Sequence, residues 1–267
     1  MTRAPMIGLL LLLWGVALAH AQQTRLEKVL ADKSKFADGG EWIYQDMPAA
    51  IAQAKQQGKP LMVVLRCIPC EQCVKLDDDV IEASPEIKPL FDKFVLARVV
   101  STNGLDLATF QFDTDQSWNV FFLNADGTIY GRFGTRSHRT EWEDDVSVAG
   151  LAKAMQGALR LHAGYPANKA QLAGKRGPQP AFASPDQYPS LKEKYVPKIE
   201  FGAQVVQSCI HCHQIGDAER LRFRAVGKPI PEQVLFPYPH PKTLGLILDP
   251  SEAATVRRVE PETPAAA

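Results

Sequence analysis

Helix and strand patterns alternate through residues 42–164. In residues 47–59 (MPAAIAQAKQQGK), apolar positions recur at helical spacing, and the pattern stops at Gly58. Residues 60–66 (PLMVVLR) follow as a short, continuous apolar run, which is typical of a strand buried on both faces. The pattern therefore predicts a helix that leads into a buried strand.

A second helical region and a second strand come next. Residues 73–94 (CVKLDDDVIEASPEIKPLFDKF) predict one or two helices that are broken around Ser84 and Pro85. Ser84 is the expected N-cap of the helix after the break, because its hydroxyl can accept a hydrogen bond from a free backbone N–H. Residues 95–100 (VLARVV) are rich in β-branched side chains and predict a strand.

A hairpin and a helix complete this region. Residues 119–134 (NVFFLNADGTIYGRFG) predict two strands joined at Asp126 and Gly127, a pair that favours a tight turn. Residues 145–164 predict an amphipathic helix, whose apolar stripe consists of Val148, Leu151, Met155, Leu159 and His162. The order helix, strand, helix, strand, hairpin, helix predicts an α/β fold with a mixed sheet flanked by helices.

The composition changes after this unit. Residues 165–197 are rich in Pro, Gly, Ala, Lys and Gln, which predicts a linker or a loosely ordered segment. Residues 198–240 contain the sequence SCIHCH and predict a small, mostly irregular or helical segment, with a short helix before the motif. Residues 241–267 predict a β-like tail.

The N-terminus carries the features of an export signal. Arg3 precedes a long apolar run, and Ala19 to Ala21 supply the small residues that a signal peptidase requires. We expect a signal peptide at residues 1–21 and an N-terminal extension at residues 22–41. An uncleaved membrane anchor is the alternative, but the run is shorter than the roughly 20 apolar residues that span a bilayer. The predicted location is periplasmic or secreted, with no membrane span after cleavage.

Charge excludes one class of partner. The chain has 30 basic and 30 acidic residues, which gives a formal net charge of zero. No summed field therefore attracts a polyanion, so neither nucleic acid nor an anionic membrane surface is an expected partner.

Three cysteines lie where the first predicted strand meets the next helix. Cys67, Cys70 and Cys73 allow two C-x-x-C pairs, Cys67 with Cys70 and Cys70 with Cys73. The N-terminus of a helix lowers the pKa of a thiol, because its free N–H groups and the positive end of its dipole stabilise the thiolate. The position favours dithiol redox chemistry. A structural disulfide and a metal bound by three thiolates are the alternatives.

Residues 42–164 resemble the thioredoxin family, in particular its extracytoplasmic members. The resemblance rests on KPLMVVLRCIPCEQC, on the acidic helix after it, and on FFLNADGTIYGRFG. It implies a thioredoxin-like fold, with Cys70 as the attacking thiol and Cys73 as the resolving thiol; the pair Cys67 and Cys70 is the second choice. The chain departs from the family near Trp118, where the usual cis-proline is missing, and at Glu71, whose charge opposes thiolate formation.

The downstream cysteines form a different motif. Cys209, Cys212 and His213 match C-x-x-C-H, the attachment motif of haem c, in which two thiols form thioethers and the histidine is the proximal iron ligand. Zinc or copper and a simple disulfide are the competing interpretations. His213 and His240 are the candidate metal-ligating histidines, and His240 is also the candidate sixth iron ligand.

The tail resembles the opening of a PDZ domain. Leu244, Gly245 and Leu246 match the loop that receives a peptide carboxylate, but only the first part of such a domain is present, so peptide binding is not expected. The arrangement as a whole looks like multidomain secreted redox proteins of bacteria.

The predicted function joins the two cysteine motifs. We expect an extracytoplasmic thiol–disulfide oxidoreductase, in the manner of a protein-disulfide reductase, that exchanges electrons with a protein thiol or disulfide partner. A covalent haem c would transfer single electrons. The alternative is a non-catalytic thioredoxin-fold scaffold that senses or binds haem, copper or zinc.

Overall fold

The structure is a computed structural model that describes residues 24–68, 74, 77, 78, 81, 84–116, 118–135, 147–238, 241–249, 251, 252 and 255–267. Four of the predictions fall on residues outside these ranges. They are the signal peptide at residues 1–21, the dithiol residues Cys70 and Cys73, and the candidate ligand His240.

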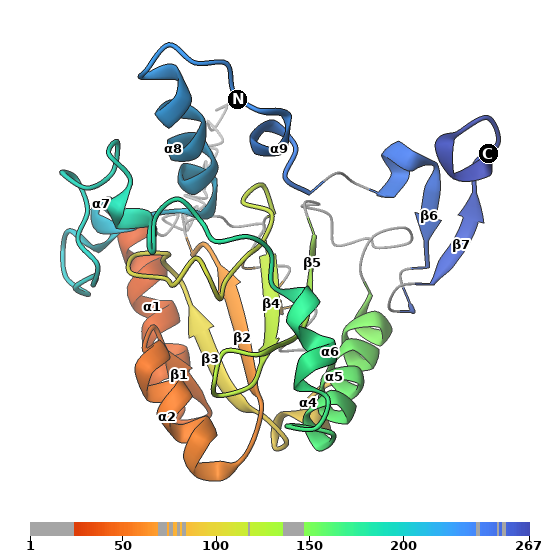
Figure 1. The fold of residues 1–267 in the computed structure, drawn as a ribbon. Helices are drawn as coiled ribbons and strands as arrows, with labels where there is room; N and C mark the ends of the chain where they lie inside the picture. Colours follow the sequence, from red (N-terminus) through yellow and green to blue (C-terminus); the bar gives the residue numbers. More distant parts are fainter. Residues whose placement is uncertain are drawn as a thin grey trace, which may run out of the picture.

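A five-stranded mixed sheet forms the centre of the molecule (Figure 1). Its strands, in sequence order, are β1 (Trp42–Tyr44), β2 (Leu61–Arg66), β3 (Val95–Val99), β4 (Trp118–Leu123) and β5 (Ile129–Thr135). The spatial order is β1-β3-β2-β4-β5. Strands β1, β3 and β2 run parallel to one another, β4 is antiparallel to β2, and β5 is antiparallel to β4. The predicted α/β fold with a mixed sheet is confirmed, and the short strand β1 is an addition that the pattern did not predict.

Alternate residues of β2 face opposite layers, as expected for a strand buried on both sides. Leu61, Val63 and Leu65 pack in the cluster that includes α2 (Met47–Gln57). Met62 packs on the opposite face, in the cluster that includes α5 (Val148–Ala163). The sheet therefore separates two apolar layers.

The helices cover both faces of this sheet. Besides α2 and α5, they include α1 (Arg25–Ala37), which lies within the predicted N-terminal extension, and the one-turn helix α4 (Lys88–Phe91). Ser84 does not cap α4, because that helix begins at Lys88 with Ile87 in the N-cap position. The Ser84 hydroxyl instead accepts a hydrogen bond from the Glu86 N–H at 3.3 Å, which makes it part of the preceding turn.

The predicted hairpin and the predicted C-terminal helix of this unit are both present. Gly127 has a φ of +78° in the turn between β4 and β5, a conformation that favours glycine. In α5, Leu151 and Met155 are buried, and the Ser147 hydroxyl caps the helix by accepting from the Gly150 N–H at 2.9 Å. His162 at the end of the stripe bonds to other parts of the fold, with Nε2 at 2.9 Å from the Gly58 carbonyl oxygen.

Residues 165–197 are more ordered than their composition predicts. This segment holds α6 (Lys169–Leu172) and two short 3-10 turns, η2 (Ala173–Lys175) and η3 (Pro185–Gln187). Buried side chains pin it to the sheet layers at Leu172, Tyr188 and Leu191. A few widely spaced apolar residues are enough to attach this segment, because each one packs into the core on one face of the sheet.

The remaining segments lie beyond the sheet. They are α7 (Val205–Ser208), α8 (Cys212–Arg224), α9 (Glu232–Leu235), η4 (Pro241–Leu244), β6 (Leu246–Leu248), β7 (Val256–Val259) and η5 (Pro264–Ala266). Strands β6 and β7 form a separate antiparallel pair at one side of the molecule (Figure 1). A PDZ-like character of this tail stays a prediction.

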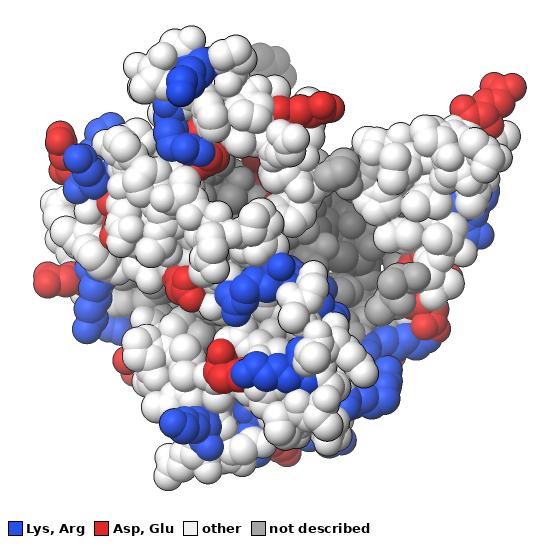
Figure 2. Space-filling model, viewed as in Figure 1, with Lys and Arg blue, Asp and Glu red and all other residues white. Residues whose placement is uncertain are grey.

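Two surface properties complete the description. Acidic and basic side chains are interspersed on the face drawn in Figure 2, in keeping with the formal net charge of zero. Among the helices of the described residues, none combines the length and the apolar character that a membrane span requires.

Candidate functional site

The two cysteine-bearing segments meet at one end of the sheet. Strands β2 and β3 are parallel, so the residues that follow them, Cys67 and Ser101, leave the sheet at the same edge. The N-terminal end of α8 lies above this edge (Figure 1). Residues more than 140 positions apart in the chain, such as Cys67 and His211, are thereby in contact (|i−j| = 144).

The contact between Cys67 and His211 is the centre of this site. The Cys67 Sγ lies 3.0 Å from the His211 Nδ1, and both side chains are half-buried. His211 occupies the N-cap position of α8. Its backbone N–H donates to the Gln214 Oε1 at 2.7 Å, and the Gln214 amide donates to the Tyr195 hydroxyl at 2.9 Å. This chain of bonds fixes the backbone from which the imidazole extends.

The loop after β3 forms hydrogen bonds to backbone groups of the downstream motif. The Thr102 N–H and hydroxyl both donate to the Ile210 carbonyl oxygen, at 3.0 and 2.9 Å. The Ile210 N–H donates to the Asn103 Oδ1 at 2.7 Å, and the Asn103 amide donates to the Ser208 carbonyl oxygen at 3.0 Å. Ile210 itself is fully buried. The motif is therefore docked on the α/β unit by hydrogen bonds to its own backbone groups as well as by apolar packing of Ile210.

The two thiols of the downstream motif point into different parts of the core. Cys209 is 4% exposed and packs with Val29 and Ile68, and its thiol donates to the Val205 carbonyl oxygen at 3.0 Å. Cys212 is 8% exposed and packs in the cluster that contains Leu65. Each thiol therefore has its own set of neighbours.

Burial keeps both of these thiols protonated at neutral pH. It raises the pKa of Cys209, against a smaller lowering by a hydrogen bond from Ser101. Burial, together with a smaller effect of negative charge on the nearby Cys67, raises the pKa of Cys212 to about 12. Burial and the positive charges of His213 and Arg25 lower the pKa of His211, so its imidazole is neutral at pH 7.

These positions bear on the predicted haem c. Two thioether bonds and an axial imidazole require Cys209, Cys212 and His213 to face one porphyrin. The two thiols instead lie in separate apolar clusters, and the His213 side chain is 59% exposed, with its Nδ1 4.0 Å from an Asp115 carboxylate oxygen. The residues in this arrangement do not fit a haem. Its attachment stays a prediction that rests on the motif alone.

A metal bound by protein ligands is the other predicted cofactor. Within the described part of the chain, no three or more His, Cys, Asp or Glu side chains are grouped so that they could hold a metal ion. The prediction that His213 and His240 bind zinc or copper includes one residue outside the described ranges, so it stays a prediction.

A buried ion network begins at Arg66, the residue before Cys67 in the chain. Arg66, the last residue of β2, donates from Nη2 to Asp32 and from Nε to Asp77, both at 2.6 Å. Arg98 of β3 forms a second ion pair with Asp77. All four side chains are at most 7% exposed. The network joins α1, two central strands and the segment after the cysteines.

The network balances its own charges. Burial alone would raise the pKa of Asp77, but Arg66 and Arg98 outweigh it and hold that pKa below its usual range. In the same way, Asp77 and Asp32 overcome the effect of burial and raise the pKa of Arg66. The Tyr44 hydroxyl donates to Asp32 at 2.6 Å, and burial raises the pKa of this tyrosine. Asp77 and Arg66 therefore stay charged at neutral pH, and Tyr44 stays neutral.

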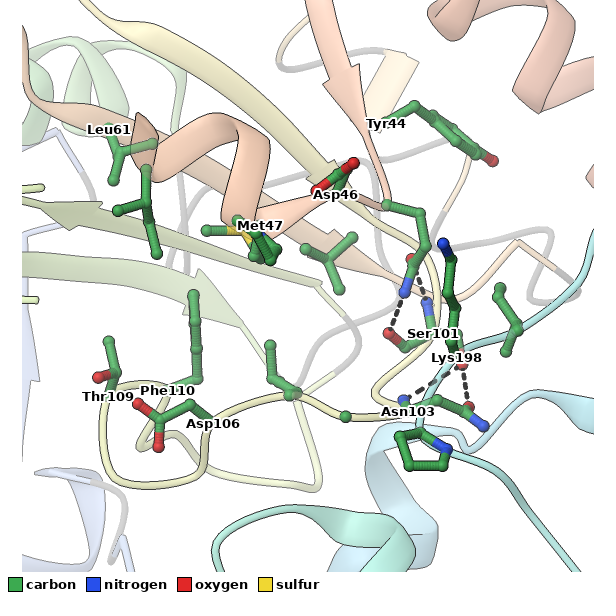
Figure 3. A pocket seen from close by; sticks show the side chains of 18 of the residues that line it. Tyr44, Asp46, Met47, Leu61, Ser101, Asn103, Asp106, Thr109, Phe110 and Lys198 are labelled. Carbon is green, nitrogen blue, oxygen red and sulfur yellow. Dashed lines mark hydrogen bonds between the residues drawn. The ribbon is translucent and has the colours of Figure 1, made fainter. Parts of the chain in front are cut away.

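A cavity of about 650 Å³ lies beside the docked segment (Figure 3). Its wall includes Met47 of α2, Phe110, and the polar residues Ser101 and Asn103 of the loop that holds the downstream motif. Among the described residues, no cysteine or histidine lines it, so the cavity and the Cys67–His211 contact are separate features.

Comparisons with known proteins agree with the architecture. Residues 42–125 match the family model described as thioredoxin-like. The thioredoxin-like match covers β1 to β4, together with Cys67 and the region of the predicted dithiol. It ends before β5 and α5, which the sequence pattern assigned to the same unit.

Two further comparisons were made. The crystal structure of a disulphide isomerase from Xylella fastidiosa Temecula1 is 21% identical and covers 43% of this chain and 85% of its own chain, with a TM-score of 0.28. A likeness at that level carries no argument about the site of this protein. Among curated proteins, no match was found.

The sequence prediction found the cysteines but missed what surrounds them. Cys67, Cys209 and Cys212 lie at or near one end of the sheet, whereas His213, the predicted ligand, points to solvent. His211, to which the C-x-x-C-H motif assigns no role, makes the contact with Cys67. Its position between two cysteines was the available signal, but only the docking of Ile210 decides which histidine faces the sheet.

Proposed function

We propose that this protein is an extracytoplasmic thiol–disulfide oxidoreductase that exchanges electrons with a protein dithiol or disulfide partner. The observation that carries the proposal is the placement of Cys67 at the end of β2, within the thioredoxin-like match and in contact with an imidazole. Cys67 starts the sequence CIPCEQC, so the predicted dithiol Cys70 and Cys73 lies within six residues of the contact between a thiol and an imidazole.

The chemistry requires a sulfur nucleophile and a second thiol. In the proposed reaction, the Cys70 thiolate attacks a partner disulfide and forms a mixed disulfide, and Cys73 displaces the partner thiol. The products are an internal disulfide and two partner thiols, so two electrons pass to the partner. A buried ion pair joins two described residues that flank the cysteines in the chain, Arg66 before them and Asp77 after them.

Insulin reduction by the purified, reduced protein tests this activity. We expect Cys70→Ser to remove it and Cys73→Ser to trap mixed disulfides, because each variant lacks one step of the exchange. Cys209→Ser is the matched control and should keep the parent rate, since its thiol is buried away from Cys67 and bonded to Val205. Equal rates in the parent and in Cys70→Ser would overturn the proposal.

Export is the second part of the proposal. Arg3, the apolar run after it and the small residues at Ala19 to Ala21 support cleavage after Ala21. N-terminal sequencing of protein recovered from the periplasm and from the medium of a bacterial host should give Gln22 as the first residue. Recovery of the intact N-terminus in the cytoplasmic fraction would contradict export.

The C-x-x-C-H motif supports a second candidate, an electron-transfer protein with a covalent haem c. The motif is the supporting observation, and the separate burial of the two thiols is the observation against it. A haem stain of the denatured protein, expressed in a host that matures c-type cytochromes, decides between them, because only a thioether-linked haem survives denaturation.

A further inference from the structure

One contact in this protein joins the two cysteine motifs, and neither motif predicts it. The Cys67 Sγ lies 3.0 Å from the His211 ring, and His211 is bonded through the backbone to Cys212. We propose that Cys67 and Cys212 form a thiol exchange pair, which lets the downstream motif act as a built-in partner of the upstream one. The proposal deepens the thiol–disulfide function and rests on it.

The structure holds the two segments together before any exchange occurs. Thr102 and Asn103 fix both polar groups of the Ile210 backbone, and Gln214 fixes the N–H of His211. Cys212 is thereby placed on the first turn of α8, facing the layer that contains Leu65 of β2, two residues before Cys67. A thiol held in this way meets its partner at a far higher effective concentration than a thiol on another molecule.

Cys209 does not share this position. Its sulfur packs against Val29 and Ile68 in a different cluster and donates to Val205 one helical turn earlier. Of the two cysteines in the downstream motif, Cys212 directly follows the histidine that contacts Cys67, and it packs in the cluster that contains Leu65. The electrostatic effect of Cys67 on the pKa of Cys212 agrees with this assignment.

The order of events follows from the burial of the two sulfurs. Cys67 is half-buried whereas Cys212 is 8% exposed, so Cys67 is the sulfur that an external disulfide reaches first. Cys67 attacks a low-molecular-weight disulfide such as oxidised glutathione and forms a mixed disulfide, releasing one thiol. Cys212 then loses its proton to solvent and displaces the second thiol. One disulfide is reduced to two thiols, and one Cys67–Cys212 disulfide forms, so electrons balance.

The pair has a consequence for the haem interpretation. A sulfur in a disulfide or in thiol exchange cannot also be a thioether on a porphyrin, so the proposal and haem attachment at Cys212 exclude each other. The separate burial of Cys209 and Cys212 favours the exchange pair.

Peptide mapping of the parent protein tests the pair directly. The reduced, full-length protein is treated with oxidised glutathione, blocked with N-ethylmaleimide and cleaved with trypsin without reduction. Cleavage after Arg66, Lys75, Lys198 and Arg220 yields peptides 67–75 and 199–220, which hold all five cysteines. We expect these two peptides to be joined in the monomer. A porphyrin mass on peptide 199–220, or peptides that are never joined, would overturn the proposal.

Two matched variants identify the sulfurs. The first variant combines Cys70→Ser, Cys73→Ser and Cys209→Ser, so only Cys67 and Cys212 remain. The second variant carries Cys212→Ser in place of Cys209→Ser, so only Cys67 and Cys209 remain. We expect at least about tenfold more intramolecular linkage in the first variant. Equal linkage in both variants overturns the assignment to Cys212. Neither variant can reduce insulin through Cys70, so this result is independent of the insulin assay, and loss of the parent's insulin activity would leave the linkage unchanged.

Discussion

Two buried polar sites lie next to each other at the end of β2, and each reduces the cost of burying ionisable groups in a different way. Arg66 faces a network of opposite charges, in which each ion is stabilised by a partner. Cys67 faces His211 and the layer of Cys212, in which burial keeps the groups neutral. The ion pairs of Arg66 stabilise the fold, whereas the neutral site contains a sulfur that can react. The comparison distinguishes a structural site from a reactive site at the same end of the sheet.

The largest effect is expected from breaking the charged site. Asp77→Asn leaves Arg66 and Arg98 short of a carboxylate in a fully buried position, so we expect a loss of about 3–5 kcal/mol in the free energy of unfolding. Urea denaturation followed by circular dichroism measures it. Asp78→Asn is the matched control, because the Lys35–Asp78 pair is about half exposed, and it should cost at most about 1 kcal/mol. Similar losses in both variants would contradict the distinction.

In the neutral site, we expect burial to slow the alkylation of the Cys212 thiol. With a pKa of about 12, the Cys212 thiolate fraction at pH 8 is about one in ten thousand, so iodoacetamide should label it about a thousandfold more slowly in the folded protein than in urea. Mass spectrometry of peptide 199–220 measures both rates. Rapid labelling of Cys212 in the folded protein would show that its thiol is not held in the core.

The docking of the downstream motif is expected to have an intermediate effect. Asn103→Ala removes the acceptor of the Ile210 N–H and the donor to Ser208, so we expect a loss of about 1–3 kcal/mol and faster labelling of Cys212. Gln111→Ala is the control, since Gln111 also bridges a distant segment, at Gly177 and Pro178, but at the surface. Faster labelling of Cys212 in the control would point to a general loosening of the fold.

A further effect is a change of stability in alkali. The folded-state pKa of Cys212 is raised from 9.0, so its contribution is fully present below pH 9 and is lost as the pH rises toward about 12. We expect the unfolding free energy of the parent to fall over this range more steeply than that of Cys212→Ala. Parallel curves, measured by urea denaturation from pH 8 to 11, would indicate that burial of this thiol does not alter its titration.

The sequence predicts the central elements of the fold because their signals are local. The continuous apolar run at residues 60–66, the turn at Gly127 and the stripe through Leu151 and Met155 each depend on neighbours within a few positions, and all are confirmed. Strand β1, at three residues, is too short for such a pattern. Its place depends on pairing with β3, which is a contact across about fifty residues.

The site was less predictable for the same physical reason. Spacing identifies C-x-x-C-H, but spacing cannot say which side chains of a motif face the core. The buried Ile210 and its bonds to Thr102 and Asn103 turn His211 toward Cys67 and leave His213 in solvent. The charged network was equally hidden, because Arg66 and Arg98 occupy strands whose other residues are apolar, and their carboxylate partners come from separate segments.

Asp32 has a consequence for where the folded unit begins. This carboxylate belongs to α1, ahead of the region that matches the thioredoxin-like model, yet it bonds to Arg66 in the central strand. A chain shortened to start at Trp42 would keep every strand of the sheet and still lose one counter-ion from its interior. The smallest piece of this protein that folds alone should therefore include the helix before the sheet.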